Sequence, residues 1–234
     1  ARGRVVVHDH LGFGLSDKPE GHDYSLIEQA DIALELWKSL GIERGLLLAH
    51  DYGTSVATEI LAQREEGRLP VTLEGVILSN GSMHIELAHL TWPQLVLQHP
   101  TLGPLLGRLG PRALFERRLR KTFARDPNPE DIRMMWHGLV AHGGRKVLGR
   151  LGRYLHERRA HWDRWIGSLT RLDLPLLVLW GREDPIAVET IARQLERECP
   201  HPTLHWLEGV GHYPMLEDPA GWAAGVEAFG SGLS

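Results

Sequence analysis

Residues 45–61, GLLLAHDYGTSVATEIL, place an acidic side chain at a sharp corner of the chain. The apolar run 46–48 predicts a buried strand, and the segment from about 54 to 63 predicts a helix. Asp51 lies between the two, with a small residue two positions before it and another two positions after it. A small-x-acid-x-small pattern between a strand and a helix has the shape of a nucleophile elbow.

Asp51 has two interpretations. It could simply cap the helix that follows, because Asp is a frequent N-cap residue. It could instead be a nucleophile that the turn lifts above the edge of a sheet, where the positive end of the helix favours an anion. In that interpretation the small side chains of Ala49 and Gly53 let the backbone turn without Cβ clashes.

Predicted strands and helices alternate along most of the chain. Short apolar, β-branched runs indicate strands, and apolar residues at helical spacing indicate helices. The predicted strands are 4–10, 46–50, 73–80, 174–181 and 203–209, and the predicted helices are 26–41, 54–63 and 219–229. Buried strands separated by helices predict an α/β fold, with a mostly parallel sheet and helices on both faces.

The stretch 83–171 departs from this alternation. It is rich in Arg, Leu, Trp and His, its periodicity is helical, and several prolines divide it into short helices. We expect a helical cap over 83–171, inserted into a core made of 1–82 and 172–234. The arginines at 108–125 and 145–164 are expected on solvated helix faces.

Two later segments strengthen the nucleophile interpretation. VLWGREDP places Asp184 just after a predicted strand, and GVGHYPMLEDP places His212 beyond the last one. Either residue alone could be an ordinary loop residue. Together with Asp51 they follow the chain order nucleophile, orienting acid and base, with Asp in place of Ser. We expect Asp51 to face the His212 imidazole across a gap that admits one water, and Asp184 to bond the other ring nitrogen.

An acidic nucleophile restricts the chemistry. After displacement at saturated carbon, a serine would be left as an ether, whereas a carboxylate is left as an ester that water can cleave. The pattern therefore favours epoxides or alkyl halides, with His212 activating the water and the backbone N–H of Tyr52 stabilising the oxyanion. No Ser occupies a G-x-S-x-G motif, which disfavours a serine esterase.

The chain resembles the α/β-hydrolase superfamily nearly end to end, in the branch of the epoxide hydrolases and haloalkane dehalogenases. DHLGFGLSDKP, HDYG, GREDP and GHYPMLEDP are similar to landmarks of that branch. LSNG and RYLHERRAHWDRWIGSL are similar to the mesoderm-specific transcript subfamily. The resemblance implies the hydrolase fold and the triad. It also implies strands before the one predicted at 4–10, so we expect an N-terminally truncated chain that lacks them.

The sequence also departs from that branch. Halide-cleaving members typically carry Trp after the nucleophile, where this chain has Tyr52. Epoxide-opening members typically use two cap tyrosines as acids, and 83–171 contains only Tyr154, which could be such an acid or a cap-core residue. Asn80 lies where some dehalogenases place a halide-binding amide, although it could also be a polar strand end bonded to backbone. Asn80 and Tyr154 are therefore the candidate substrate-binding residues.

The composition of the chain limits the classes of binding partner and the cellular compartment that we expect. A net charge of −4 does not suggest nucleic acid, and no apolar run is long enough to span a membrane. The single cysteine excludes an internal disulfide and favours a reducing, cytoplasmic location. His8 and His10 lack further ligands, so no metal and no cofactor are expected. The expected partner is a small apolar organic substrate, with the oligomeric state left open. The alternative is a binding or scaffold protein on a hydrolase fold.

Overall fold

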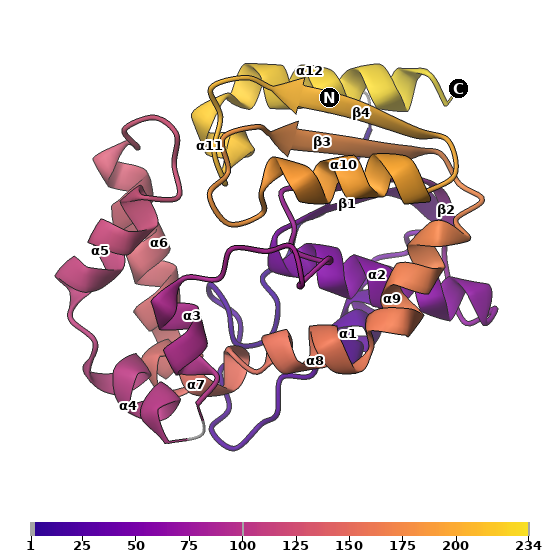
Figure 1. The fold of residues 1–234 in the computed structure, drawn as a ribbon. Helices are drawn as coiled ribbons and strands as arrows, with labels where there is room; N and C mark the ends of the chain where they lie inside the picture. The colour runs from indigo at the N-terminus through magenta and orange to yellow at the C-terminus, as the bar shows by residue number, and fades with distance from the viewer. Residues whose placement is uncertain (1–2, 100, 234) are drawn as a thin grey trace.

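The computed structural model describes residues 3–99 and 101–233 (Figure 1). Its one sheet contains β1 (Arg44–His50), β2 (Thr72–Ser79), β3 (Leu176–Gly181) and β4 (Pro202–Leu207). The spatial order is β1-β2-β3-β4 and every pair is parallel. The carboxyl ends of all the strands therefore lie at one edge of the sheet, which is where the candidate site residues follow them.

Helices precede, separate and follow the strands. The α-helices are α1 (Leu26–Ser39), α2 (Tyr52–Glu65), α3 (Trp92–Leu97), α4 (Leu102–Leu109), α5 (Arg112–Arg120), α6 (Pro129–Val140), α7 (Leu148–Leu151), α8 (Tyr154–Ala160), α9 (Trp162–Thr170), α10 (Glu189–Glu198), α11 (Pro214–Glu217) and α12 (Pro219–Ser231). A short 3-10 helix, η1 (Ala141–Lys146), follows α6. The helices expected at 26–41, 54–63 and 219–229 are confirmed as α1, α2 and α12, whereas the sequence analysis did not identify α10 and α11.

Both faces of the sheet are covered, as expected for parallel strands. On one face, alternate residues of the strands, including Leu47, Val76 and Trp180, join a core with residues of α1, α2, α9 and α10. On the other face, Ile77 and Leu179 belong to a smaller cluster packed against α12. Burying a large apolar side chain contributes about 1.5–3 kcal/mol, so these two layers fix the positions of the strand ends.

The expected strand at 4–10 is wrong. This segment has no helix or strand assignment, and the Val5 and Val7 side chains are 76% and 88% exposed. A strand needs a neighbour for its ladder of hydrogen bonds, and among the described residues none pairs with this segment. The outer edge of β1 is likewise unpaired there, and Leu46 and Leu48 remain more than one third exposed.

The segment between β2 and β3 is entirely helical where it is regular, from α3 to α9. In Figure 1 the arrowheads of β3 and β4 point toward the side of the molecule on which α5 and α6 lie. Helix α9 returns along α2, where Arg164 and Trp165 bond the buried Glu59 at 2.8 Å. The division into a core and a cap at 83–171 stays a prediction, and the name cap segment is used below for residues 83–171.

Candidate functional site

Asp51 forms the corner between β1 and α2 in a strained conformation. Its backbone has φ 44° and ψ −112°, a region that side-chain-bearing residues rarely adopt. Its N–H donates to Ser79 O at 3.3 Å, which attaches the corner to the end of β2. Its carbonyl accepts from Thr54 N at 3.1 Å and from Thr54 Oγ1 at 2.5 Å. Strand β2 and the first turn of α2 therefore hold the corner from both sides.

The Asp51 side chain does not cap α2, so the capping interpretation is wrong. The side chain is 37% exposed and accepts no hydrogen bond from the first N–H groups of the helix. At position 53 a Cβ would lie 3.9 Å from the Ala49 Cβ, which is an ordinary contact. Only a small residue is needed at this point of the turn.

Asp51, His212 and Asp184 come together at the carboxyl edge of the sheet. His212 Nε2 lies 3.6 Å from Asp51 Oδ2, and His212 Nδ1 lies 2.7 Å from Asp184 Oδ2. The second contact is a hydrogen bond, and the first is longer than one. A gap of 3.6 Å is also too short for a water between the two atoms. The expectation of a water within this gap is wrong, and a water that bonds both atoms would have to lie beside the pair.

Asp184 is fixed by a full set of donors. Its Oδ1 accepts from the N–H groups of Ile186 at 2.7 Å and Ala187 at 3.0 Å. Its Oδ2 accepts from His212 and from Asn80 Nδ2, the latter at 2.9 Å. A carboxylate held by four donors has little freedom to rotate, so it fixes the orientation of the imidazole.

The charges of the three residues reinforce one another. Burial alone would lower the pKa of His212, but the neighbouring carboxylates of Asp184 and Asp51 raise it to about 10. Burial alone would raise the pKa of Asp51, but contact with His212 and the positive charges of His212 and Arg158 hold it well below its usual range. At neutral pH the site therefore contains an ionised Asp51 beside a protonated His212.

His50, which the sequence analysis did not single out, positions the loop that carries His212. Its Nε2 lies 2.6 Å from the His212 carbonyl oxygen. Burial and the charge of His212 lower the pKa of His50 to about 4, so the ring is neutral and donates this bond. Its place directly before Asp51, at the end of a strand, was the only sequence signal for this role.

Asn80 follows β2 and is fully buried, with φ 39°. Its Nδ2 contacts Asp184 Oδ2, Gly181 O at 3.1 Å and Gly211 O at 3.3 Å, and its Oδ1 accepts from Gly181 N at 2.8 Å. This arrangement favours the interpretation of Asn80 as a polar strand end over that of a substrate-binding amide. Asn80 instead connects Asp184 to the backbone at the ends of β3 and β4.

Tyr52 and Tyr154 lie together beside the corner, with ring centroids 5.4 Å apart. The backbone N–H of Tyr52, the first residue of α2, has no hydrogen-bond partner among the described residues, so it is open to an oxyanion. The Tyr154 hydroxyl accepts from Gln94 Nε2 at 3.3 Å. Burial raises the pKa of Tyr154, and the charge of Asp51 adds to that increase, so this phenol lies within the field of the carboxylate.

A second phenol near Asp51 was missed because it lies outside the cap segment. The Tyr213 ring lies 4.9 Å from the His212 ring and stacks on Phe123 at 5.0 Å. Burial raises the pKa of Tyr213, and the charges of Asp51 and Asp184 contribute to the increase. Tyr154 and Tyr213, which come from different parts of the chain, therefore both lie within the field of the Asp51 carboxylate.

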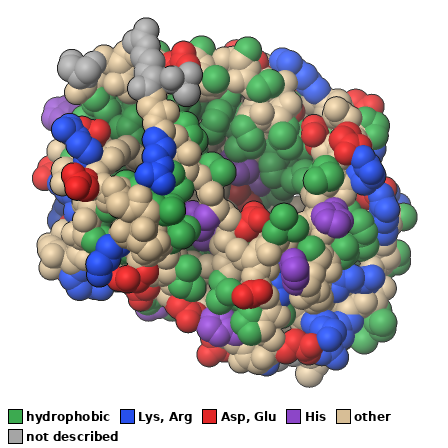
Figure 2. All heavy atoms as spheres, turned by 180° about the vertical axis from the view of Figure 1, so that it is seen from behind, with side chains coloured by type: hydrophobic (Ala, Val, Ile, Leu, Met, Phe, Trp, Pro, Cys, Tyr) green, Lys and Arg blue, Asp and Glu red, His purple; other side chains and the backbone are tan. Residues whose placement is uncertain are grey.

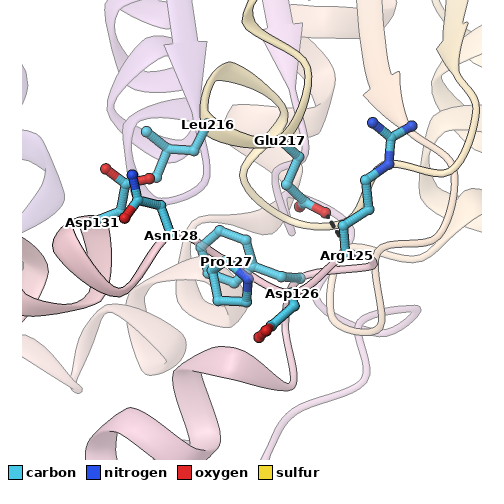
Figure 3. A pocket seen from close by; sticks show the side chains of 8 residues that line it. Arg125, Asp126, Pro127, Asn128, Asp131, Leu216 and Glu217 are labelled. Carbon is cyan, nitrogen blue, oxygen red and sulfur yellow. Dashed lines mark hydrogen bonds between the residues drawn. The ribbon is translucent and has the colours of Figure 1, made fainter.

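A small cavity, which Phe123 helps to line, lies between the loop after α5 and helix α11 (Figure 3). Its volume is about 140 Å³. Figure 3 shows Arg125 and Glu217 at one end of it, where the Glu217 carboxylate accepts from backbone N–H groups of residues 124, 125 and 211. These bonds hold the Glu217 carboxylate in place, and none of Asp51, Asp184 and His212 lines this cavity.

Another face of the molecule is hollowed. Figure 2 shows a hollow walled largely by hydrophobic side chains, with histidine and acidic side chains visible within it. Within the described part of the chain, no three His, Cys, Asp or Glu side chains are arranged to hold a metal ion. No described helix is long and apolar enough to cross a bilayer.

Comparison with known proteins confirms the resemblance that the sequence motifs indicated. A family described as the alpha/beta hydrolase fold matches residues 1–219. The putative hydrolase LipZ of Mycobacterium tuberculosis is 40% identical over 220 residues, which cover 93% of this chain and 76% of LipZ. The mesoderm-specific transcript homolog protein of Homo sapiens is 36% identical over 229 residues, covering 94% of this chain and 68% of that protein.

Solved structures support the same fold. The crystal structure of haloalkane dehalogenase DbeA from Bradyrhizobium elkani superposes with a TM-score of 0.79, covering 96% of this chain and 79% of that one. The sequence identity is 21%, so this likeness concerns the fold alone.

Proposed function

Because the chain belongs to the α/β hydrolase fold family, we propose that it is a hydrolase in which Asp51 attacks saturated carbon and forms a covalent alkyl ester. The observation that carries this proposal is the carboxylate at the corner, exposed, not used as a cap, and 3.6 Å from an imidazole that Asp184 holds. A carboxylate nucleophile suits small substrates with a strained or polarised carbon–oxygen or carbon–halogen bond.

Within this class, the arrangement favours an epoxide over an alkyl halide. Opening an epoxide creates an alkoxide that needs a proton, and the Tyr154 phenol lies within the field of Asp51. A departing halide instead needs free N–H donors. The residue after Asp51 is Tyr52, whose side chain offers no N–H, and the Asn80 amide already bonds Asp184 and backbone carbonyls.

The proposed first step forms one bond and breaks another. An Asp51 carboxylate oxygen bonds the epoxide carbon, the ring carbon–oxygen bond breaks, and the ring oxygen takes a proton from Tyr154. His212 then passes its proton through solvent to the Tyr154 phenolate, and water adds to the ester carbonyl carbon, giving a proton to His212, while the Tyr52 N–H stabilises the oxyanion. Collapse breaks the ester bond, and the leaving alkoxide takes the proton from His212 to give a diol. The carboxylic acid left at Asp51 gives its proton through solvent to His212, which restores the starting state. The sum is addition of one water to one epoxide.

The charge of His212 changes in step with this reaction. Both Asp184 and Asp51 raise its pKa in the free protein. Once Asp51 is esterified, its negative charge is gone and one of these two causes disappears. The pKa of His212 then falls, and the ring becomes able to take a proton from water. His212 is therefore protonated, and unable to act as a base, while Asp51 attacks. It becomes a base once the ester has formed and must be cleaved.

The experiment that tests this proposal traps the ester. His212→Ala should allow attack by Asp51 but block hydrolysis, so incubation with styrene oxide should leave one epoxide mass on the peptide that contains Asp51. Mass spectrometry of the digested protein measures this addition. Asp51→Ala is the control and should carry no adduct at that peptide. A His212→Ala protein that stays unmodified with styrene oxide and with 1-bromohexane would contradict the proposal and favour the binding-protein alternative.

A further inference from the structure

Arg158 of helix α8 reaches from the cap segment into the core, directly beneath the corner. It is 1% exposed, although arginines of this stretch were expected on solvated faces. Its Nε donates to Ser55 Oγ at 2.6 Å, and its Nη1 donates to Ser82 Oγ. Its Nη2 approaches the Asp51 carbonyl oxygen at 3.4 Å. One side chain thus contacts the first turn of α2, the loop after β2 and the corner itself.

No carboxylate forms an ion pair with Arg158 in the described part of the chain. Arg164, one helix further on, shows the usual arrangement, with Glu59 at 2.8 Å and Glu66 at 2.5 Å. Burying a guanidinium among neutral hydroxyls costs free energy that a neutral side chain with the same bonds would not cost. The positive charge of Arg158 therefore remains uncompensated by any direct partner, and its field reaches the nearby Asp51 carboxylate.

Arg158 also contacts the proposed acid. Its guanidinium carbon lies 4.5 Å from the centre of the Tyr154 ring, within the range of a cation–π contact. Burial raises the pKa of Tyr154, whereas the charge of Arg158 and the hydrogen bond from Gln94 lower it. The charge of Arg158 likewise lowers the pKa of Asp51. Loss of a proton from Tyr154 and ionisation of Asp51 both become easier beside this cation.

We propose, on the basis of the function proposed above, that Arg158 is a positioning residue for the reaction. It fixes the corner through the Asp51 carbonyl, holds the Tyr154 ring in place, and supplies a positive charge that both groups experience. It does not contact the substrate, because the Tyr154 ring and the core cover it. The cap segment therefore contributes to the reactivity of Asp51 through Arg158, in addition to any substrate contacts it makes.

The test compares charge and shape in the His212→Ala background, where the ester accumulates. The variants Arg158→Gln and Arg158→Lys are each combined with His212→Ala, and the rate of adduct formation at Asp51 is measured with styrene oxide from pH 4 to 9. Rates at saturating and at low styrene oxide separate the chemical step from binding. The matched control is Arg164→Gln, which also removes an arginine between the cap segment and α2 but lies at Glu59 rather than at Asp51.

Arg158→Gln should slow adduct formation at saturating substrate at least about tenfold, because a lost charge-assisted bond costs that factor or more. The acid limb of its pH–rate profile, where protonation of Asp51 slows adduct formation, should move to higher pH, because Asp51 loses a positive neighbour. Arg158→Lys should keep the acid limb while recovering only part of the rate, and Arg164→Gln should change the rate less than about twofold.

Two outcomes would overturn the inference alone. One is an Arg158→Gln rate and acid limb that match those of Arg164→Gln, which would assign Arg158 a structural role only. The other is an acid limb that Arg158→Lys shifts as far as Arg158→Gln does, which would show that the positive charge of Arg158 is not what acts on Asp51. Absence of any adduct in His212→Ala itself would instead overturn the proposed function and this inference with it.

Discussion

Replacing Asn80 by alanine should destabilise the protein strongly, because one buried side chain satisfies several groups at once. Asn80→Ala leaves the Gly181 N–H without its acceptor, which costs about 1–3 kcal/mol. It also removes the amide bond to the Asp184 carboxylate, which contributes about 1.5–3 kcal/mol. Alanine at φ 39° adds about 1–2 kcal/mol. Although Asp184 keeps its bonds from His212 and two N–H groups, we expect a total loss of about 3.5–8 kcal/mol.

The matched variant Asn80→Asp separates shape from hydrogen-bond donation. It keeps the acceptor for Gly181 N–H and tolerates the positive φ, but it places a second carboxyl 2.9 Å from Asp184. Two carboxylates at this distance cannot both stay ionised, so the loss for this variant should grow as the pH rises above about 5.

Urea unfolding, followed by tryptophan fluorescence, measures the free energy of unfolding of both variants and of the unmodified protein. A loss below about 1 kcal/mol for Asn80→Ala, against a typical total stability of about 5–15 kcal/mol, would refute the reasoning. A loss for Asn80→Asp that does not change between pH 4 and 8 would show that the amide donates nothing of consequence to Asp184.

Two further predictions concern the packing around the site. His84 is buried and bonds Glu86 and Glu198, and despite burial these carboxylates raise its pKa above the ordinary value of 6.5. The stabilisation that these ion pairs give is therefore complete below pH 6.5 and is lost as the pH rises through the raised pKa. In urea unfolding, His84→Gln should lose more free energy of unfolding at pH 6 than at pH 9. An equal loss at the two pH values would contradict this assignment. A Cβ at Gly81 would lie 2.2 Å from Thr54 Oγ1, so Gly81→Ala should cost about 1–3 kcal/mol and slow adduct formation; unchanged stability would count against this packing.

The three candidate residues that the structure brings together share one property. Asp51 and Asp184 each follow a short apolar run that forms a strand, and His212 follows the last strand after a short loop. In a parallel sheet all carboxyl ends lie at one edge, so positions in the sequence translate directly into proximity in space. The same reasoning was enough for the sheet and for most of the helices that cover it.

Local sequence patterns do not predict interactions between distant segments of the chain. The run at 4–10 has the composition of a strand, but a ladder also requires a neighbouring strand, which composition cannot reveal. Arg158 lies in a stretch rich in arginine, and nothing in that stretch distinguishes the buried one from those in solvent. Tyr213 lies outside the cap segment and joins the candidate site only through the fold of its loop, which no local pattern in the sequence indicates.

The backbone conformation of Asp51, the proposed nucleophile, lowers the stability of the fold. A residue with a side chain at φ 44° and ψ −112° costs on the order of 1–3 kcal/mol, and glycine would relieve much of that strain. A laboratory library selected only for heat resistance would therefore enrich glycine at position 51 and discard the carboxylate. Engineering of a hardier variant has to hold this position constant, or score every candidate for ester formation as well as for survival at high temperature.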